Sequence, residues 1–305
     1  MATLPTSMGD EDAVLRILAS SRPLPLAQMG LSERNHREVA RILARPYGLI
    51  LCVGPTGSGK TTTLHAALGH LNTPDMKIWT AEDPVEITQA GLRQMQVNVR
   101  AGLTFASAMR AFLRNDPDVI MVGEMRDPET AGIAVEASLT GHLVLSTLHT
   151  NSAPEAVSRL LDMGLDPFSF ADALAGVLAQ RLARALCKRC KEPYDAPDDA
   201  RAEIALSLGE AATASRPELA PGGAAALAGS GLRGLRQQRL QGPRGAARAD
   251  DHRPGDQAPR RPPRAGGRAA RRLRGGGMTT LLQDGIEKCL LGLTDLRQVL
   301  AVCTA

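Results

Sequence analysis

Short apolar runs alternate with segments of helical periodicity over most of the first 185 residues. Four runs have the length of buried strands and meet glycine or polar residues where they end: 48–53, 76–81, 118–124 and 142–149. Between them, apolar residues recur every three or four positions in 60–71, 104–115 and 128–138, which predicts helices. This alternation predicts an α/β fold, with a mostly parallel sheet covered on both faces.

Helical spacing also appears outside this block. It is present in 12–20 and 34–46 before the first strand, and in 153–163 and 169–185 after the last. From Met278 the pattern resumes and predicts a small α-helical C-terminal region. No basic start followed by an apolar run marks a signal sequence, and no apolar stretch approaches the roughly 18 residues of a membrane helix, so a cytoplasmic location is expected.

The sequence GPTGSGKT (54–61) fits the pattern G-x-x-x-x-G-K-[ST] between a predicted strand and a predicted helix, which favours a P-loop over a chance glycine-rich turn. In a P-loop, backbone N–H groups surround phosphate oxygens. Lys60 then supplies positive charge to the β- and γ-phosphates of ATP, and the Thr61 hydroxyl binds Mg²⁺. The expected nucleotide-binding residues are Gly54, Pro55, Thr56, Gly57, Ser58, Gly59, Lys60, Thr61 and Thr62.

Acidic residues follow two of the predicted strands. The strand in 118–124 ends on Glu124, and Glu82, Asp83 and Glu86 follow the strand in 76–81. The carboxyl ends of parallel strands gather catalytic groups at one edge of a sheet. A carboxylate at that edge can support Mg²⁺ or position the attacking water, although a single acid can equally be a solvated strand end or a helix cap.

Two histidines, His142 and His149, flank the predicted strand in 142–149. Seven residues of a period-2 strand place them on opposite faces, so one of them is expected to reach the nucleotide. His149 is favoured because it lies at the carboxyl end. The alternative for each is a structural histidine with its hydrogen bonds satisfied.

Four sequence blocks resemble the secretion ATPase family of type II secretion and type IV pilus assembly. They are GLILCVGPTGSGKTTTLHAAL, TAEDPVE, LRNDPDVIMVGEMRDPETAGIAVEASLTGHLVLSTLHTNSA and QRLARALCKRC. They match that family's Walker A, Asp-box, Walker B and His-box signatures in order. The resemblance runs from about Leu15 to Tyr194 and resumes from Gly277.

The resemblance implies a RecA-like P-loop ATPase that works as a homohexamer. It further implies mechanical work on a platform protein, with the ATPase peripheral to the bacterial inner membrane through its partners. By the same resemblance, Glu82 activates water and Glu124 supports Mg²⁺. The secretion branch and the pilus-assembly branch of the family share these motifs. The motifs therefore do not determine which of the two functions this chain serves. Residues 1–46 resemble only the last piece of the family's preceding domain and a linker.

Cys187 and Cys190 form a C-x-x-C pair, half of a four-cysteine Zn²⁺ site. Secretion and pilus-assembly members of the family carry a second C-x-x-C pair further along the chain. This chain has no such pair, so Zn²⁺ is expected only where the second pair is restored.

The position where the second pair is expected has an unusual composition. Between Gly231 and Gly277 there are thirteen Arg, no Lys and three Asp, a net charge of +10 in a chain of net +4. The rest of the chain therefore sums to −6, so the basicity is local. Without lysines or aromatic residues to stack bases, a nucleic-acid-binding arm is disfavoured.

Several codons can encode each residue of this stretch. If the same nucleotides are read one base later, some of these codon choices encode a different protein sequence. From Gly231 to Arg244 that frame permits Gly-Cys-x-x-Cys followed by Gly-Tyr-Lys-Gly-Arg, the pattern missing above. Residues 226–277 are therefore predicted to be out-of-frame translation. The alternative is a genuine Arg/Gly/Pro linker that is disordered by composition.

These patterns divide the chain into five predicted parts. They are the remnant of a preceding domain (1–46), a RecA-like ATPase domain (47–186), half a zinc-binding element with a linker (187–225), the unusual segment (226–277) and C-terminal helices (278–305). The expected function is ATP hydrolysis that powers type II secretion or pilus assembly. An inactive nucleotide-binding remnant is the alternative, and a RecA-like DNA motor is less favoured.

Overall fold

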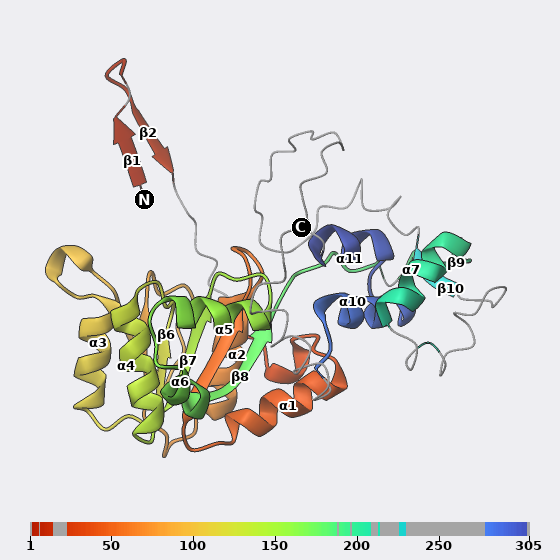
Figure 1. Cartoon of the computed structure of the whole chain (residues 1–305). Helices are drawn as coiled ribbons and strands as arrows, with labels where there is room; N and C mark the ends of the chain where they lie inside the picture. Colours follow the sequence, from red (N-terminus) through yellow and green to blue (C-terminus); the bar gives the residue numbers. More distant parts are fainter. Residues whose placement is uncertain are drawn as a thin grey trace.

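A six-stranded sheet with helices on both faces forms the main body of the molecule, and the C-terminal helices form a second group beside it (Figure 1). The computed structural model describes residues 2–5, 7–14, 23–187, 189–195, 197–208, 213, 226–229 and 278–303. Of the segment predicted to be out of frame, residues 230–277 lie outside the described residues, so that prediction stays a prediction.

All pairings within the six-stranded sheet are parallel. Its spatial order is β5 (Arg93–Gln96), β4 (Ile78–Glu82), β6 (Val119–Val122), β7 (Leu143–Leu148), β3 (Gly48–Val53) and β8 (Leu174–Ala179). The four strands that the sequence predicted are present, and the α/β fold with a parallel sheet is confirmed. The edge strands β5 and β8 were not predicted.

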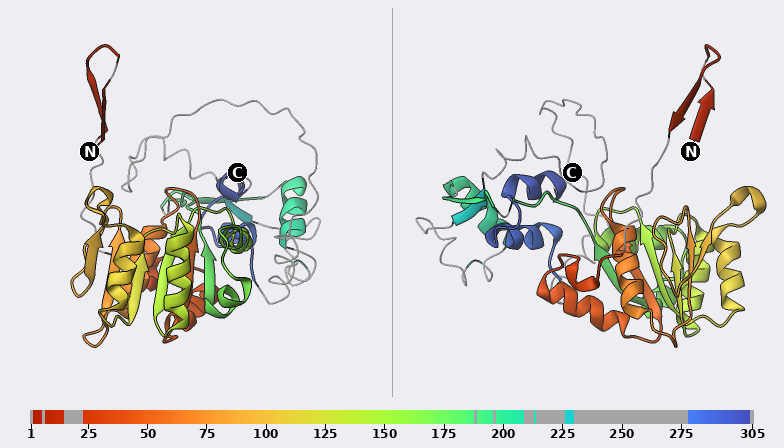
Figure 2. Two further views of the ribbon diagram at one scale, coloured as in Figure 1. Left: turned by 60° about the vertical axis from the view of Figure 1, so that its left-hand side comes forward. Right: turned by 180° about the vertical axis from the view of Figure 1, so that it is seen from behind.

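Each face of the sheet is covered by its own helices (Figure 2). Along β3, Leu49, Leu51 and Val53 pack toward one face, while Ile50 and Cys52 pack toward the other. The first face holds α3 (Phe105–Leu113), α4 (Pro128–Leu139), α5 (Ala153–Asp162) and α6 (Pro167–Ala173). The second holds η1 (Leu26–Gln28), α1 (Glu33–Leu43) and α2 (Lys60–Leu71). Since both faces are buried, the central strands β3 and β6 are apolar throughout.

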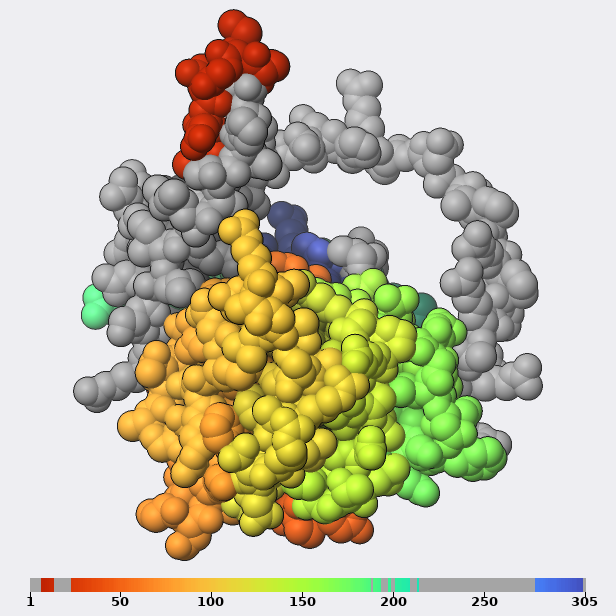
Figure 3. All heavy atoms as spheres, turned by 90° about the vertical axis from the view of Figure 1, so that its left-hand side faces the viewer, coloured from red at the N-terminus to blue at the C-terminus, as the bar shows by residue number. Residues whose placement is uncertain are grey.

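Short polar side chains fix where the helices of the first face begin. Thr104 caps α3 in a reciprocal capping box with Ser107, and Asp127 caps α4 just before Pro128. Ser152 caps α5 in the same way. Figure 3 shows the outer surface over α3 and α4, from which the short turn of residues 98–103 projects.

Two predicted helices are wrong in part. Residues 12–14 belong to β2 (Glu11–Val14), which pairs with β1 (Ala2–Pro5) in an antiparallel hairpin, and 15–22 lie outside the described residues. The helix predicted over 169–185 ends at Ala173, and the apolar residues after it form β8 along the free edge of β3. A short apolar run fits a buried strand or a buried helix equally well, so periodicity could not decide.

The C-terminal region is helical, as predicted. Helices α10 (Leu281–Leu290) and α11 (Leu296–Cys303) pack with α7 (Asp198–Leu208) around a cluster of their own. Beside α7, β9 (Glu192–Asp195) pairs with β10 (Ala226–Gly229). The Leu186 N–H donates to Leu293 O and attaches this group to the end of the sheet domain. Over the described residues, no helix has the length and apolar character needed to span a membrane.

Candidate active site

The residues singled out in the sequence lie in a row along the carboxyl edge of the sheet. Glu82 is the last residue of β4, Glu124 follows β6, and His149 directly follows β7. The P-loop then leaves β3, the next strand of the sheet. The spatial order of the strands thus brings together groups that are far apart in the sequence, at the edge where α/β proteins bind ligands.

The P-loop residues 54–59 form a tight turn between β3 and α2. Gly57 and Gly59 have φ values of 78° and 85°, a left-handed conformation that glycine adopts without steric cost. Lys60 begins α2 and is 8% exposed. Its Nζ donates to Gly54 O at 2.9 Å and to Pro55 O at 3.0 Å. Burial lowers the pKa of Lys60, and the nearby carboxylate of Glu124 opposes that shift.

The turn has the features of a phosphate cradle. Ser58 is 3% exposed, and its Oγ has no hydrogen-bond partner among the described residues. Thr61 and Thr62 are half-buried in the first turn of α2, whose N-terminal N–H groups have no carbonyl partner in the helix. An unpaired buried hydroxyl, a lysine amino group and a helix N-terminus together fit a triphosphate with its Mg²⁺.

Glu124 lies between the imidazole of His149 and the guanidinium of Arg126. Its Oε1 is 3.2 Å from His149 Nε2, and its Oε2 is 2.8 Å from a terminal nitrogen of Arg126. The Glu124 side chain is 18% exposed, so this carboxylate faces the edge without being fully solvated. His142 lies at the opposite end of β7, where its Nδ1 is 3.0 Å from Ala137 O. The structure therefore brings His149, and not His142, to the P-loop edge.

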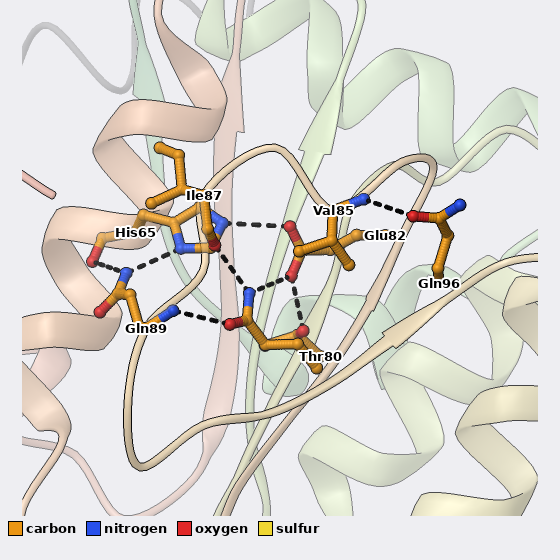
Figure 4. Close-up of polar contacts among 8 residues, drawn as sticks. His65, Thr80, Glu82, Val85, Ile87, Gln89 and Gln96 are labelled. Carbon is orange, nitrogen blue, oxygen red and sulfur yellow. Dashed lines mark hydrogen bonds and ion pairs between the residues drawn. The ribbon is translucent and has the colours of Figure 1, made fainter. Parts of the chain in front are cut away.

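Glu82 is held inside a polar network (Figure 4). Its Oε1 accepts from Thr80 Oγ1 at 2.6 Å and from Gln94 Nε2 at 3.0 Å, and its Oε2 is 3.1 Å from His65 Nε2. The residue is 3% exposed. Burial raises the pKa of Glu82, but the hydrogen bonds from His65, Thr80 and Gln94 outweigh it, and the pKa lies below 4.5. Glu82 is therefore an ionised, buried carboxylate. Its neighbour Asp83 is exposed.

Gln180 is a site residue that the sequence did not reveal. It directly follows β8, and its Nε2 donates to Ser58 O in the P-loop at 2.8 Å. Thr63 Oγ1 donates to Gln180 Oε1 at 2.7 Å. The rule that strand ends carry functional residues would have found Gln180 if 174–179 had been recognised as a strand. His65 had no such signal, because it lies within a helical segment.

The cysteine pair shows no sign of a complete metal site. Cys187 and Cys190 are in contact, and N–H groups of Arg189 and Cys190 lower the pKa of the Cys187 thiol. No group of three or more His, Cys, Asp or Glu side chains that could hold a metal ion occurs in the part of the chain that the structure describes. A zinc site is therefore not supported by the residues around Cys187.

A cleft of about 1100 Å³ opens beside the nucleotide edge, between the sheet domain and the C-terminal helices. Its wall includes His149, Gln180 and Arg181 on one side and Asp284 on the other. Arg181 donates to Asn151 Oδ1 at 2.9 Å and to Asn151 O at 3.2 Å, so the guanidinium is fixed in the wall of the cleft. The edge is thus open to a ligand from this side.

A parallel sheet with a P-loop and acidic residues on neighbouring strands defines a RecA-like P-loop nucleotide-binding protein. Within that class, the chain belongs to the Type II/IV secretion system protein family, whose model matches residues 1–301. A type II secretion system protein E of Pectobacterium carotovorum is 45% identical over 304 residues, 99% of this chain. The type IV pilus assembly ATPase PilB of Thermus thermophilus is 42% identical over 309 aligned residues, also 99% of this chain.

A solved structure supports the same grouping. The pilus retraction motor PilT with bound ADP is similar with a TM-score of 0.58 and 26% identity, covering 94% of this chain and 68% of that one. The chain is shorter than its sequence relatives: it spans 58% of the Pectobacterium protein and 33% of the Thermus protein.

Proposed function

We propose that this chain binds Mg-ATP at the P-loop and hydrolyses it as part of a secretion or pilus-assembly motor. The observation that carries the proposal is the row formed by Lys60 at the start of α2 and by Glu124 and His149 after the adjacent strands β6 and β7, beside an unpaired P-loop hydroxyl. Family membership supports the same reaction, since relatives carry the names type II secretion system ATPase and type IV pilus assembly ATPase.

Each residue has a distinct role in the proposed reaction. Within residues 54–62, the backbone N–H groups, which Pro55 lacks, and the Lys60 ammonium would hold the phosphates, and Thr61 and Glu124 would hold the metal. When bound, Mg²⁺ neutralises charge that develops on the phosphate oxygens. Glu82 is ionised, so it can accept a hydrogen bond from the attacking water and orient it. His149 holds Glu124 from the next strand and is the histidine that we assign to the nucleotide site.

The assembly that we propose is a homohexamer at the inner face of the bacterial inner membrane, acting on a platform protein. Support for it comes from family membership. Both type II secretion and pilus-assembly proteins match almost the whole chain, so the proposal covers both kinds of machinery. Native mass spectrometry with ATP and Mg²⁺ tests the assembly: a six-fold mass supports it, and a monomer at every concentration contradicts it.

The activity is tested by phosphate release from the purified full chain, with and without Mg²⁺. Lys60→Ala should abolish both turnover and nucleotide binding. Glu124→Gln should abolish turnover and retain binding in the absence of metal, because it leaves the P-loop intact. Glu129→Gln, at an exposed glutamate paired with Arg110, is the matched control and should behave as the unmodified chain. Binding without turnover in the unmodified chain would favour an inactive nucleotide-binding protein.

A further inference from the structure

The imidazole of His65 is buried where α2 packs against the end of β4 and the loop that follows β4. His65 is 0% exposed and belongs to α2, five residues after Lys60. Its Nε2 is 3.1 Å from Glu82 Oε2, and its Nδ1 is 2.7 Å from Gln89 Nε2 (Figure 4). Both ring nitrogens are thus engaged, one with the end of β4 and one with the loop that follows it.

The contacts determine which ring nitrogen carries the proton. Gln89 Nε2 also donates to the backbone carbonyl of His65 at 2.9 Å, and a carbonyl only accepts. The Gln89 atom that faces the ring is therefore the amide nitrogen, and it donates to His65 Nδ1. Because Nδ1 accepts, the proton of the neutral ring is on Nε2, which donates to Glu82 Oε2.

The partners of His65 are themselves fixed. The Gln89 N–H donates to Gln94 Oε1 at 2.8 Å, and Gln94 Nε2 donates to Glu82 Oε1 and to Ile87 O. Oε1 of Glu82 therefore accepts two hydrogen bonds and Oε2 accepts one. A carboxylate has about four lone-pair sites, so one site on Oε2 is left for a water molecule.

His65 joins two parts of the site that the sheet keeps apart. Strands β6 and β7 lie between β4 and β3, so three strand spacings of about 4.8 Å, roughly 14 Å, separate the strand of Glu82 from that of the P-loop. Helix α2 begins at the P-loop and packs across this face, where its Leu64 and Leu68 share a cluster with Ile78 of β4. Through His65, the helix that carries Lys60 contacts Glu82 directly.

We propose that His65 is a positioning residue for Glu82: held by Gln89 with its proton on Nε2, it fixes Glu82 Oε2 relative to the P-loop helix. This rests on the proposed role of Glu82 in orienting the attacking water. His65 itself touches neither nucleotide nor water. A displacement of α2 that accompanies a change at the P-loop is passed by the His65 imidazole to the carboxylate.

The proton position is tested on the unmodified full chain by NMR with ¹⁵N-labelled histidine. For His65 we expect a pyridine-type Nδ1 signal and a pyrrole-type Nε2 signal. The assignment comes from the peak that disappears in His65→Gln. Gln89→Ala should alter this pattern, because the donor to Nδ1 is removed. An Nδ1–H tautomer, or a ring with both nitrogens protonated, overturns the proposal.

The positioning role is tested by separating turnover from binding. His65→Ala should lower kcat for ATP by about 10-fold or more, because a small misplacement of a group that orients a reactant can cost up to about 100-fold in rate. The affinity for a fluorescent ATP analogue should change less than threefold. His65→Gln, whose amide nitrogen can replace Nε2–H as donor, should recover most of the turnover. His70→Ala, at the exposed end of the same helix, is the matched control.

The outcomes separate this proposal from the proposed function. If the unmodified chain binds but does not hydrolyse ATP, the hydrolytic function fails, and the NMR pattern still tests whether His65 donates from Nε2 to Glu82. Unchanged turnover in His65→Ala contradicts positioning. So does a loss in His65→Gln as large as that in His65→Ala, provided that thermal unfolding shows both variants to be folded. Equal losses of affinity and turnover indicate damage to α2 and also contradict it.

Discussion

Thr63 and Gln180 are 117 residues apart in the sequence, and the Thr63 hydroxyl donates to Gln180 Oε1 at 2.7 Å. The same glutamine donates to Ser58 O, so its side chain bridges the P-loop and the second turn of α2. The backbone of Gln180 continues the pairing of β8 with β3, since its N–H donates to Val53 O at 2.8 Å. The residue that follows edge strand β8 thus stabilises the P-loop, although it lies outside the P-loop sequence motif.

Gln180→Ala is expected to weaken nucleotide binding, because Ser58 O and the Thr63 hydroxyl lose their half-buried partner. Loss of such hydrogen bonds costs about 1–3 kcal/mol, and about 1.4 kcal/mol corresponds to a tenfold change in Kd. Titration with a fluorescent ATP analogue measures the change. Gln28→Ala, at an exposed position in η1, is the control. Equal affinity of Gln180→Ala and the unmodified chain would show that the hydrogen bonds of Gln180 have no effect on nucleotide binding.

Glu82 is expected to contribute acid-sensitive stability. Its pKa in the folded chain lies below the ordinary 4.5, so its contribution is present above pH 4.5 and is lost as pH falls through the folded-state pKa. Glu82→Gln should therefore lower the free energy of unfolding near pH 7 by about 1–3 kcal/mol. The difference from the unmodified chain should shrink below pH 4.5.

Urea unfolding between pH 3 and pH 7 measures this difference. Glu38→Gln alters a carboxylate that is exposed and paired with Arg41, so it should show a small gap at every pH. A gap for Glu82→Gln that stays constant down to pH 3 would refute the assignment of this stability to the ionised carboxylate.

The cysteines are expected to differ in reactivity. Burial raises the pKa of Cys52 to about 12, so at pH 8 about one thiol in ten thousand is ionised. Cys289 is also buried, and its pKa is raised to about 12. The pKa of Cys187 is lowered instead. Brief treatment of the native chain with iodoacetamide at pH 8, followed by peptide mass spectrometry, should find label on Cys187 and little on Cys52 or Cys289. Rapid labelling of Cys52 would mean that its surroundings open readily.

Two helical glycines should respond in opposite directions to alanine. A Cβ on Gly285 would overlap Cγ1 of Val299, where α10 crosses α11. Gly285→Ala should therefore destabilise the C-terminal group by about 1–3 kcal/mol through overpacking. A Cβ on Gly132 in α4 meets nothing within 4 Å, so Gly132→Ala should stabilise by about 0.5–1 kcal/mol. Thermal unfolding of both variants checks the signs, and a stable Gly285→Ala would contradict the close crossing of α10 and α11.

The sequence by itself determined the sheet class and the P-loop. The central strands are apolar on both sides, and the phosphate-binding turn requires glycines and a lysine at fixed spacing, so both are local patterns that a single chain displays. Glu124 and His149 were also predictable, because each directly follows an apolar run. Local pattern did not separate the helix in 167–173 from the strand that follows it.

Only the tertiary structure decided which distant side chains support those residues. Gln180 reaches the P-loop because β8 adds to the free edge of β3, and strand order is a property of the whole sheet. His65 meets Glu82 because α2 packs across the strands, a contact between residues 17 apart that helix periodicity does not encode. Hydrogen-bond partners of buried polar groups depend on three-dimensional packing, so the sequence showed the functional groups but not what holds them in place.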